Sequence, residues 1–286
     1  MIQRTGAREM TFPLTEIQKH RLRELGASAA FLERSFADAR ERDKAFKDLE
    51  KKWVEEGRER LTELRDHGRR PMLCKMERVL VDALVDQGFV QVVTPLLLSK
   101  GLLEKMAITS AHPLSQQVFW VSGHKCLRPM LAPHLYSLLP KLLRLWGKPV
   151  RIFEVGSCFR KESKGSQHLD EFTMLNLVEL GLPEEERHAR LEELAGVVMR
   201  AAGIDHYELV RKESEVYGET IDVVAGTEVC SGAMGPHALD DAWGVVDAWV
   251  GLGFGLERLL MVKEGFSNIH RAGRSLAYLD GVRLNI

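Results

Sequence analysis

Two stretches of sequence, Val150-Arg-Ile-Phe-Glu-Val-Gly-Ser-Cys-Phe159 and Glu171-Phe-Thr-Met-Leu-Asn-Leu-Val-Glu-Leu180, predict the strands that decide the fold. The residues Ser163–Gln167 between them are rich in small and polar side chains, as in a loop. Two strands joined by such a loop predict an antiparallel hairpin. We therefore expect the two strands to pair directly with each other.

The second of these strands is apolar on both faces. Alternate side chains of a strand point to opposite sides of the sheet, and in Glu171–Leu180 both sets are largely apolar. This pattern predicts a central strand that is buried on both sides. Asn176 would then be a buried amide, which is satisfied by backbone groups or contacts a ligand. The strand by itself leaves these two alternatives open.

Arg160 and Glu162 follow the first strand and are expected on one side of it. An arginine can direct two donors at a phosphate, and a carboxylate can accept a hydrogen bond from an exocyclic amine. For an isolated Arg-Lys-Glu, however, a solvated surface cluster is the commoner interpretation.

A second candidate phosphate site lies near the C-terminus. Val245–Val250 predicts a strand that turns through the glycines of Gly253-Phe-Gly-Leu-Glu-Arg258 into a helix. The glycines alternate, unlike the G-x-G-x-x-G of dinucleotide-binding proteins, and the chain contains no P-loop sequence. Phosphates would therefore be bound by arginine side chains such as Arg258, together with a metal ion.

The remaining elements predict an α+β fold. Apolar residues recur with helical spacing from Leu73 to Leu84, and further helices are expected at His134–Trp146 and Pro183–Ala202. Additional strands are expected at Phe89–Val93, Val118–Val121, Glu219–Val224 and Thr227–Met234. Strands and helices without regular alternation favour a mostly antiparallel β-sheet flanked by helices.

The N-terminal region predicts a separate helical appendage. Thr15-x-x-Gln18 resembles a capping box at the start of a short helix. From Phe31 to Asp66 the sequence is dense in charged residues, which predicts one or two exposed helices. The composition changes at His67-Gly-Arg-Arg-Pro71, so we expect an N-terminal helical region over residues 1–68 and a catalytic domain over residues 69–286.

Composition limits the class of protein. The 286 residues are 45% hydrophobic and 28% charged, as in a globular protein. The first residues have no apolar run of the signal-peptide type, and no apolar stretch is long enough to span a membrane, so we expect a cytoplasmic protein. Four dispersed cysteines indicate neither disulfides nor a structural zinc. With a net charge of -1, any nucleic-acid contact must use local basic patches.

Three segments resemble, in order, the three motifs of the class II aminoacyl-tRNA synthetases. They are Gly88-Phe-Val-Gln-Val-Val-Thr-Pro95, Phe153-Glu-Val-Gly-Ser-Cys-Phe-Arg-Lys-Glu162 with His168-Leu-Asp-Glu-Phe-Thr-Met174, and Gly253–Leu260. Leu127-Arg-Pro-Met-Leu-Ala-Pro133, Glu171-Phe-Thr-Met-Leu-Asn176, Val216-Tyr217-Gly and Trp249-Val-Gly-Leu-Gly-Phe-Gly255 further resemble the pyrrolysyl-tRNA synthetases. The similarity extends from about Thr15 to the end, and resembles the short form of that family, which lacks a separate N-terminal tRNA-binding domain.

This resemblance implies activation of pyrrolysine with ATP and transfer to the 3′-end of the pyrrolysine suppressor tRNA. Arg160 would hold the α-phosphate and Arg258 the γ-phosphate, so these are the expected catalytic residues. Glu162 would bind the adenine amine and Phe172 would stack on the adenine. Glu228 and Ser231 would bind Mg²⁺, which prefers hard oxygen ligands. The expected ATP-binding residues are Arg160, Glu162, His168, Leu169, Phe172, Glu228, Val229, Ser231 and Arg258.

The resemblance also implies a deep and mostly apolar pocket for the amino acid. Its expected residues are Met130, Ala132, Leu135, Tyr136, Leu139, Asn176, Val178, Tyr217, Ala233, Trp249 and Gly251. In this pocket Asn176 would donate to the amide carbonyl of an acylated lysine side chain. A free lysine ammonium would lose its hydration and find no carboxylate. The sequence departs from the family pattern at His134, where asparagine is usual, at Pro140 within the pocket helix, and at Gly232-Ala-Met234.

The same resemblance implies partners for this protein, and alternative functions stand beside it. A homodimer is expected through the segment around Pro95, and tRNA phosphates are expected to contact Lys19, Arg21, Arg23, basic residues of Lys44–Lys52, Arg69 and Arg70. One alternative is a class II synthetase for another large apolar amino acid, such as phenylalanine. The others are a non-catalytic nucleotide-binding paralogue and a bare tRNA-binding module.

Overall fold

The computed structural model describes residues 11–161, 165, 168–214 and 218–286. The chain divides into two compact units. The smaller unit consists of Met1–Pro71 with Ser275–Ile286, and the larger one is Met72–Arg274. The C-terminal segment of the chain therefore belongs to the same unit as the N-terminal helices.

The smaller unit has helices α1 (Glu16–Leu25), α2 (Ala29–Leu32) and α3 (Ala39–Glu63), followed by a π-helical turn at Leu64–Gly68. The predicted capping box is present: the Thr15 hydroxyl accepts from the Gln18 backbone N–H, and the Gln18 side chain accepts from that of Thr15. Short strands β1 (Phe12–Pro13) and β2 (Ser35–Phe36) pair with each other, as do β13 (Tyr278–Leu279) and β14 (Val282–Arg283).

The helices of this unit enclose a small core of their own, which the charge-rich sequence did not indicate. Leu14, Leu22, Ala27 and Leu32 are buried together. Gly57 of α3 is also buried, and a Cβ atom there would lie 2.9 Å from the side chains of Val282 and Ile286. The C-terminal segment thus packs directly on a glycine of α3, which permits the close approach.

The larger unit contains a seven-stranded sheet with the order β3-β7-β8-β12-β11-β10-β9. All neighbouring strands are antiparallel except β3 and β7. The strands are β3 (Val90–Gln91), β7 (Val150–Phe159), β8 (Glu171–Leu180), β12 (Trp249–Gly255), β11 (Glu228–Gly235), β10 (Gly218–Val224) and β9 (Glu208–Ser214). The predicted hairpin of β7 and β8 is confirmed, and β8 lies inside the sheet, between β7 and β12.

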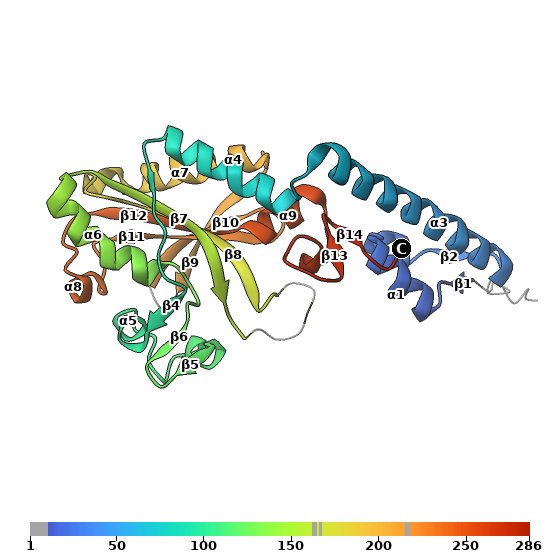
Figure 1. Ribbon diagram of the computed structural model, residues 1–286, viewed down its shortest axis with the longest axis horizontal. Coiled ribbons are helices and arrows are strands. Elements are labelled where there is room, and N and C mark those ends of the chain that lie inside the picture. The colour runs from blue at the N-terminus through green and yellow to red at the C-terminus, as the bar shows by residue number, and fades with distance from the viewer. Residues whose placement is uncertain (1–10, 162–164, 166–167, 215–217) are drawn as a thin grey trace, which may run out of the picture. The chain divides into compact units, whose positions relative to one another are not determined.

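Helices cover both faces of this sheet (Figure 1). On one face α4 (Met72–Asp86), α7 (Arg187–Ala202) and α9 (Leu256–Glu264) pack over Leu175 and Leu177 of β8. On the other, α6 (Ala132–Trp146), α5 (Lys100–Lys105) and α8 (Asp240–Trp243) pack over Val178 and Leu180. These two apolar clusters explain why β8 is apolar on both sides.

Shorter elements complete the larger unit. A three-stranded sheet has the order β4 (Leu97–Ser99), β6 (Lys125–Leu127), β5 (Trp120–Ser122). Single 3-10 turns lie at Pro113–Gln117, Glu184–Glu186 and Ile269–Arg271. Helix α6 continues through Pro140 to Trp146. Within the described residues, no helix combines the length and apolar character needed to cross a membrane.

The strand expected at Val245–Val250 instead occupies Trp249–Gly255. Gly251, Gly253 and Gly255 therefore lie within a strand and pair with residues of β8. The predicted turn through these glycines is wrong, because they pair within the sheet, although glycine usually weakens a strand. The structure shows a different use: alternate positions without side chains leave one face of β12 open, and that face borders the candidate site.

Candidate active site

Two adjoining pockets lie on the sheet face that carries Asn176, and together they contain most of the predicted site residues. Both are lined by Arg160, Met174, Ser231 and Gly253. Each has an empty volume of about 760 Å³, including space open to solvent. One is mostly apolar and extends under α6, whereas the other is lined by charged side chains.

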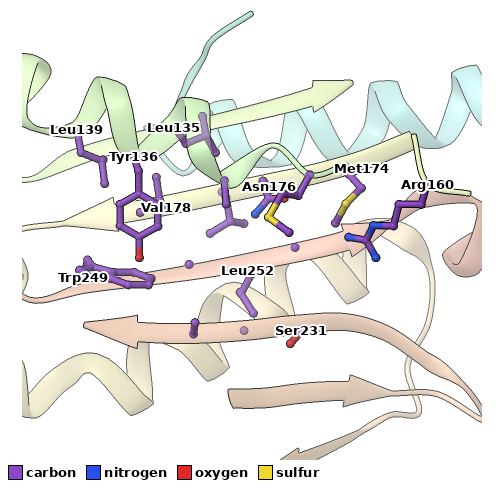
Figure 2. Close-up of a pocket in the computed structure, with 17 residues that line it drawn as sticks. Leu135, Tyr136, Leu139, Arg160, Met174, Asn176, Val178, Ser231, Trp249 and Leu252 are labelled. Carbon is purple, nitrogen blue, oxygen red and sulfur yellow. The ribbon is translucent and has the colours of Figure 1, made fainter. Parts of the chain in front are cut away.

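The apolar pocket lies between α6 and strands β8, β11 and β12 (Figure 2). The predicted residues that line it are Met130, Ala132, Leu135, Tyr136, Leu139, Asn176, Val178, Ala233, Trp249 and Gly251. Tyr217 lies outside the described residues. The prediction did not include Met174, Leu177, Gly232, Leu252 or Gly253. The alternating glycines of β12 were the signal for this open strand face.

Asn176 lies in the middle of β8 and faces this pocket (Figure 2). Its register partner on β12 is Gly253, where a Cβ atom would lie 3.3 Å from both the oxygen and the nitrogen of the Asn176 amide. No described residue forms a hydrogen bond with that amide. The geometry therefore favours the second of the two alternatives for Asn176, a polar group that is available to a ligand.

The charged pocket contains six of the other predicted ATP residues besides Arg160, namely His168, Phe172, Glu228, Val229, Ser231 and Arg258. The Arg160 Nε donates to the backbone oxygen of Pro129 at 2.9 Å, and its guanidinium carbon lies 5.3 Å from the centre of the Phe172 ring. Leu169 is 8% exposed and belongs to the apolar core, and it does not line the pocket. Glu162 lies outside the described residues.

Arg258 borders the other side of this pocket and contacts Glu228 twice. Its Nη1 donates to the Glu228 backbone oxygen at 3.0 Å and lies 3.6 Å from the carboxylate. The Lys212 Nζ also approaches this carboxylate, at 3.2 Å, and pairs with the buried Asp222 at 2.8 Å. The pocket thus combines the guanidinium groups of Arg160 and Arg258 with the Glu228 carboxylate, which lies close to both Arg258 and Lys212.

Glu257, next to Arg258, anchors the start of α9. Both its oxygens accept from the backbone N–H of Thr173, at 3.0 and 2.9 Å, and one accepts from the Thr173 hydroxyl. Burial raises the pKa of Glu257, while the Thr173 donors and Arg274 oppose that rise. This buried carboxylate ties α9 to β8, which fixes the backbone that carries Arg258.

A buried ion pair joins Arg128 to Glu154 of β7. The Arg128 Nη1 lies 2.7 Å from the Glu154 carboxylate, and these side chains are 2% and 1% exposed. Thr94 donates to the same carboxylate from its backbone and its hydroxyl, and the Arg128 Nε donates to the Ser157 backbone oxygen. A Cβ at Gly156 would overlap the guanidinium. The sequence signal for this network was a glutamate between the apolar residues Phe153 and Val155.

Comparisons with known proteins place this geometry in one group of enzymes. Residues 63–236 match the family model described as the phenylalanyl tRNA synthetase beta chain CLM domain. A solved structure of a pyrrolysyl-tRNA synthetase from Desulfitobacterium hafniense is 56% identical, with a TM-score of 0.92, over 97% of this chain and 100% of that one. A second structure from that organism is 55% identical, with a TM-score of 0.90, over 100% of this chain and 99% of the other.

More distant similarity extends to the lysine--tRNA ligases of Listeria monocytogenes and Listeria innocua. Each is 29% identical over 131 residues, or 45% of this chain. The matched part covers 24% of the length of those ligases, so the similarity concerns one part of a larger protein.

Proposed function

The chain belongs to the pyrrolysyl-tRNA synthetase family, with the α+β catalytic core of class II synthetases, and we propose that it activates pyrrolysine with ATP. The products of this step are an aminoacyl-adenylate and pyrophosphate, and the acyl group then passes to the 3′-end of the pyrrolysine suppressor tRNA. The observation that carries this proposal is the amide of Asn176, which pairs with no described residue and lies in an apolar pocket that adjoins an arginine-lined one.

The pocket chemistry supports an acylated lysine side chain as the substrate. Among its described lining residues are no Asp and no Glu, and the wall is made mainly of aliphatic and aromatic side chains. A lysine ammonium would be desolvated there without a counter-ion, which is strongly unfavourable. A neutral amide would keep one hydrogen bond, with Asn176 as donor to its carbonyl. Selection against lysine then needs no editing step, because an unpaired buried charge already discriminates.

The charged pocket supports the nucleotide half of the reaction. In this proposal Arg160 binds the α-phosphate, Phe172 stacks on adenine and Arg258 binds the γ-phosphate. A carboxylate oxygen of the amino acid attacks the α-phosphorus, and the bond to the pyrophosphate oxygen breaks. No protein nucleophile takes part, so the enzyme contributes positioning and stabilisation of charge. Arg160 lines both pockets and hence lies where the two substrates must meet.

The donor set at Glu228 and Ser231 fits Mg²⁺ that arrives with ATP. Both residues line the charged pocket and offer oxygen ligands. In the described part of the chain no three His, Cys, Asp or Glu side chains are grouped to hold a metal by themselves. Mg²⁺ commonly uses one or two protein oxygens plus substrate phosphates. When bound, it would neutralise phosphate charge during the displacement.

Further proposals concern the partners. Basic side chains of the N-terminal region, residues 1–68, would contact tRNA phosphates, and binding should weaken as salt rises. The segment next to Pro95 carries exposed apolar side chains, with Val93 88% and Leu96 48% exposed. Such a patch suits a homodimer contact. Sedimentation that shows a monomer at micromolar concentration would contradict the dimer.

Pyrophosphate exchange over a panel of amino acids tests the proposed function. We expect exchange with pyrrolysine and with Nε-acylated lysines, and none with lysine. The panel includes phenylalanine because the chain matches the phenylalanyl family model. Exchange with phenylalanine alone would favour this rival substrate. ATP binding without any exchange would indicate a non-catalytic paralogue, and tRNA binding without charging would indicate a bare tRNA-binding module.

A further inference from the structure

The end of the apolar pocket farthest from Arg160 is closed by the rings of Tyr136 and Trp249 (Figure 2). These rings meet edge to face, with centroids 5.4 Å apart. Tyr136 also stacks on Trp243, at 5.3 Å between centroids. Tyr136 and Trp249 are only 5% and 3% exposed. The orientation of packed aromatic rings therefore sets the length of the pocket.

Asp240 lies behind this aromatic wall and does not line the pocket. Its Oδ2 accepts a hydrogen bond from the Trp249 indole N–H at 2.9 Å and another from the His237 backbone N–H at 2.7 Å. The residue is 3% exposed. Burial raises the pKa of Asp240, and the indole, the His237 backbone and the Tyr136 hydroxyl act against that rise. A buried carboxylate needs such donors, and here the Trp249 indole of the pocket wall provides one of them.

The indole of Trp249 occupies space that a side chain at Gly235 would fill. Gly235 is the register partner of Trp249, and a Cβ at Gly235 would overlap the indole ring. The ring therefore fits only because Gly235 has no side chain. In this arrangement the hydrogen bond to Asp240 is the directional contact that selects one orientation of the indole.

We propose that Asp240 is a positioning residue that determines amino-acid specificity: it holds Trp249 so that the aromatic wall ends the pocket at a fixed length. This inference rests on the proposed function, because it assumes that the acylated side chain of the substrate occupies this pocket. Without the carboxylate, the indole N–H would be buried without an acceptor, which is costly. The indole would then turn to find another partner, and the end wall would move.

The test is pyrophosphate exchange with a short and a long substrate, Nε-acetyl-lysine and Nε-benzyloxycarbonyl-lysine. For Asp240→Leu we expect the KM for the amino acid to rise about 10-fold, as for a lost buried hydrogen bond. The KM for ATP should stay unchanged, and the preference should shift towards the longer substrate. Asp240→Asn keeps an acceptor oxygen and should restore both values. The matched control is Asp241→Leu, an exposed neighbour in α8.

A double-mutant comparison separates positioning from a general effect on folding. Trp249→Phe removes the indole N–H, so Asp240→Leu should change the KM little further in that background. Equal effects of Asp240→Leu with and without Trp249→Phe would overturn the inference, as would equal KM values for Asp240→Leu and Asp241→Leu. If Asp240→Leu does not fold, the test uses Trp249→Phe alone. An unchanged preference of Trp249→Phe between the short and the long substrate then refutes the inference. Failure of the wild type to use any lysine derivative is a different result, which refutes the proposed function.

Discussion

Replacing Arg128 by methionine should destabilise the larger unit more than any change at a surface ion pair. The guanidinium is 2% exposed, and its partner Glu154 is 1% exposed. Removing Arg128 leaves a buried carboxylate whose remaining donors come from Thr94. Breaking one side of a buried pair costs about 3–5 kcal/mol. The Arg128 side chain also donates to the backbone oxygen of Ser157, which would lose that hydrogen bond.

Urea unfolding followed by circular dichroism measures this cost, with the free energy extrapolated to water. The control is Arg78→Met, whose partner Asp82 lies one turn along α4, with side chains 68% and 64% exposed. An exposed pair of this kind contributes about 0.3–0.5 kcal/mol. In Arg128→Met/Glu154→Leu part of the stability should return, so the two changes should not be additive. A loss no larger than that of Arg78→Met, or full additivity, would refute the reasoning.

Three further predictions concern activity and pH. Gly253→Ala should raise the KM for the amino acid about 10-fold and leave the KM for ATP nearly unchanged, because the added Cβ would lie 3.3 Å from the Asn176 amide. The control in the same exchange assay is Gly101→Ala, whose added Cβ would meet nothing within 4 Å. Arg258→Ala should lower the exchange rate about 10²–10³-fold with an unchanged circular dichroism spectrum, and near-normal exchange would contradict its phosphate role. Burial, aided by Arg128, lowers the pKa of His134 from its ordinary 6.5. The unfolded chain therefore binds a proton at His134 more readily than the folded one, and the stability present above pH 6.5 should be lost as the pH falls below 6.5. His134→Asn should lack this part of the pH dependence of Tm, and equal slopes of Tm against pH for the variant and the wild type would contradict the prediction.

The sequence alone determined those elements whose signals are local. Both strands of the central hairpin have the predicted bounds, because a strand that is buried on two sides must be apolar on two sides. The capping box at Thr15 is confirmed for a similar reason, since its four residues satisfy one another. The resemblance to class II synthetases rests on three such segments in order.

Other features were decided by contacts between residues that are distant in the sequence. The glycines of β12 were interpreted as a turn, because nothing near them in the chain shows that Asn176 lies opposite and needs the space. The ion pair of Arg128 with Glu154 joins positions 26 residues apart, so no local pattern of the sequence pairs them.

Asp240 gives the clearest contrast between the two levels. In the sequence it is one of two adjacent aspartates, and no periodicity or spacing distinguishes it from Asp241. In the structure Asp241 is exposed, whereas Asp240 is buried and accepts a hydrogen bond from Trp249. The sequence by itself determined the two strands of the central hairpin, the capping box and the order of the three charged motifs. Only the tertiary structure decided which polar groups are buried and paired, because burial and pairing depend on what the rest of the chain places around each side chain.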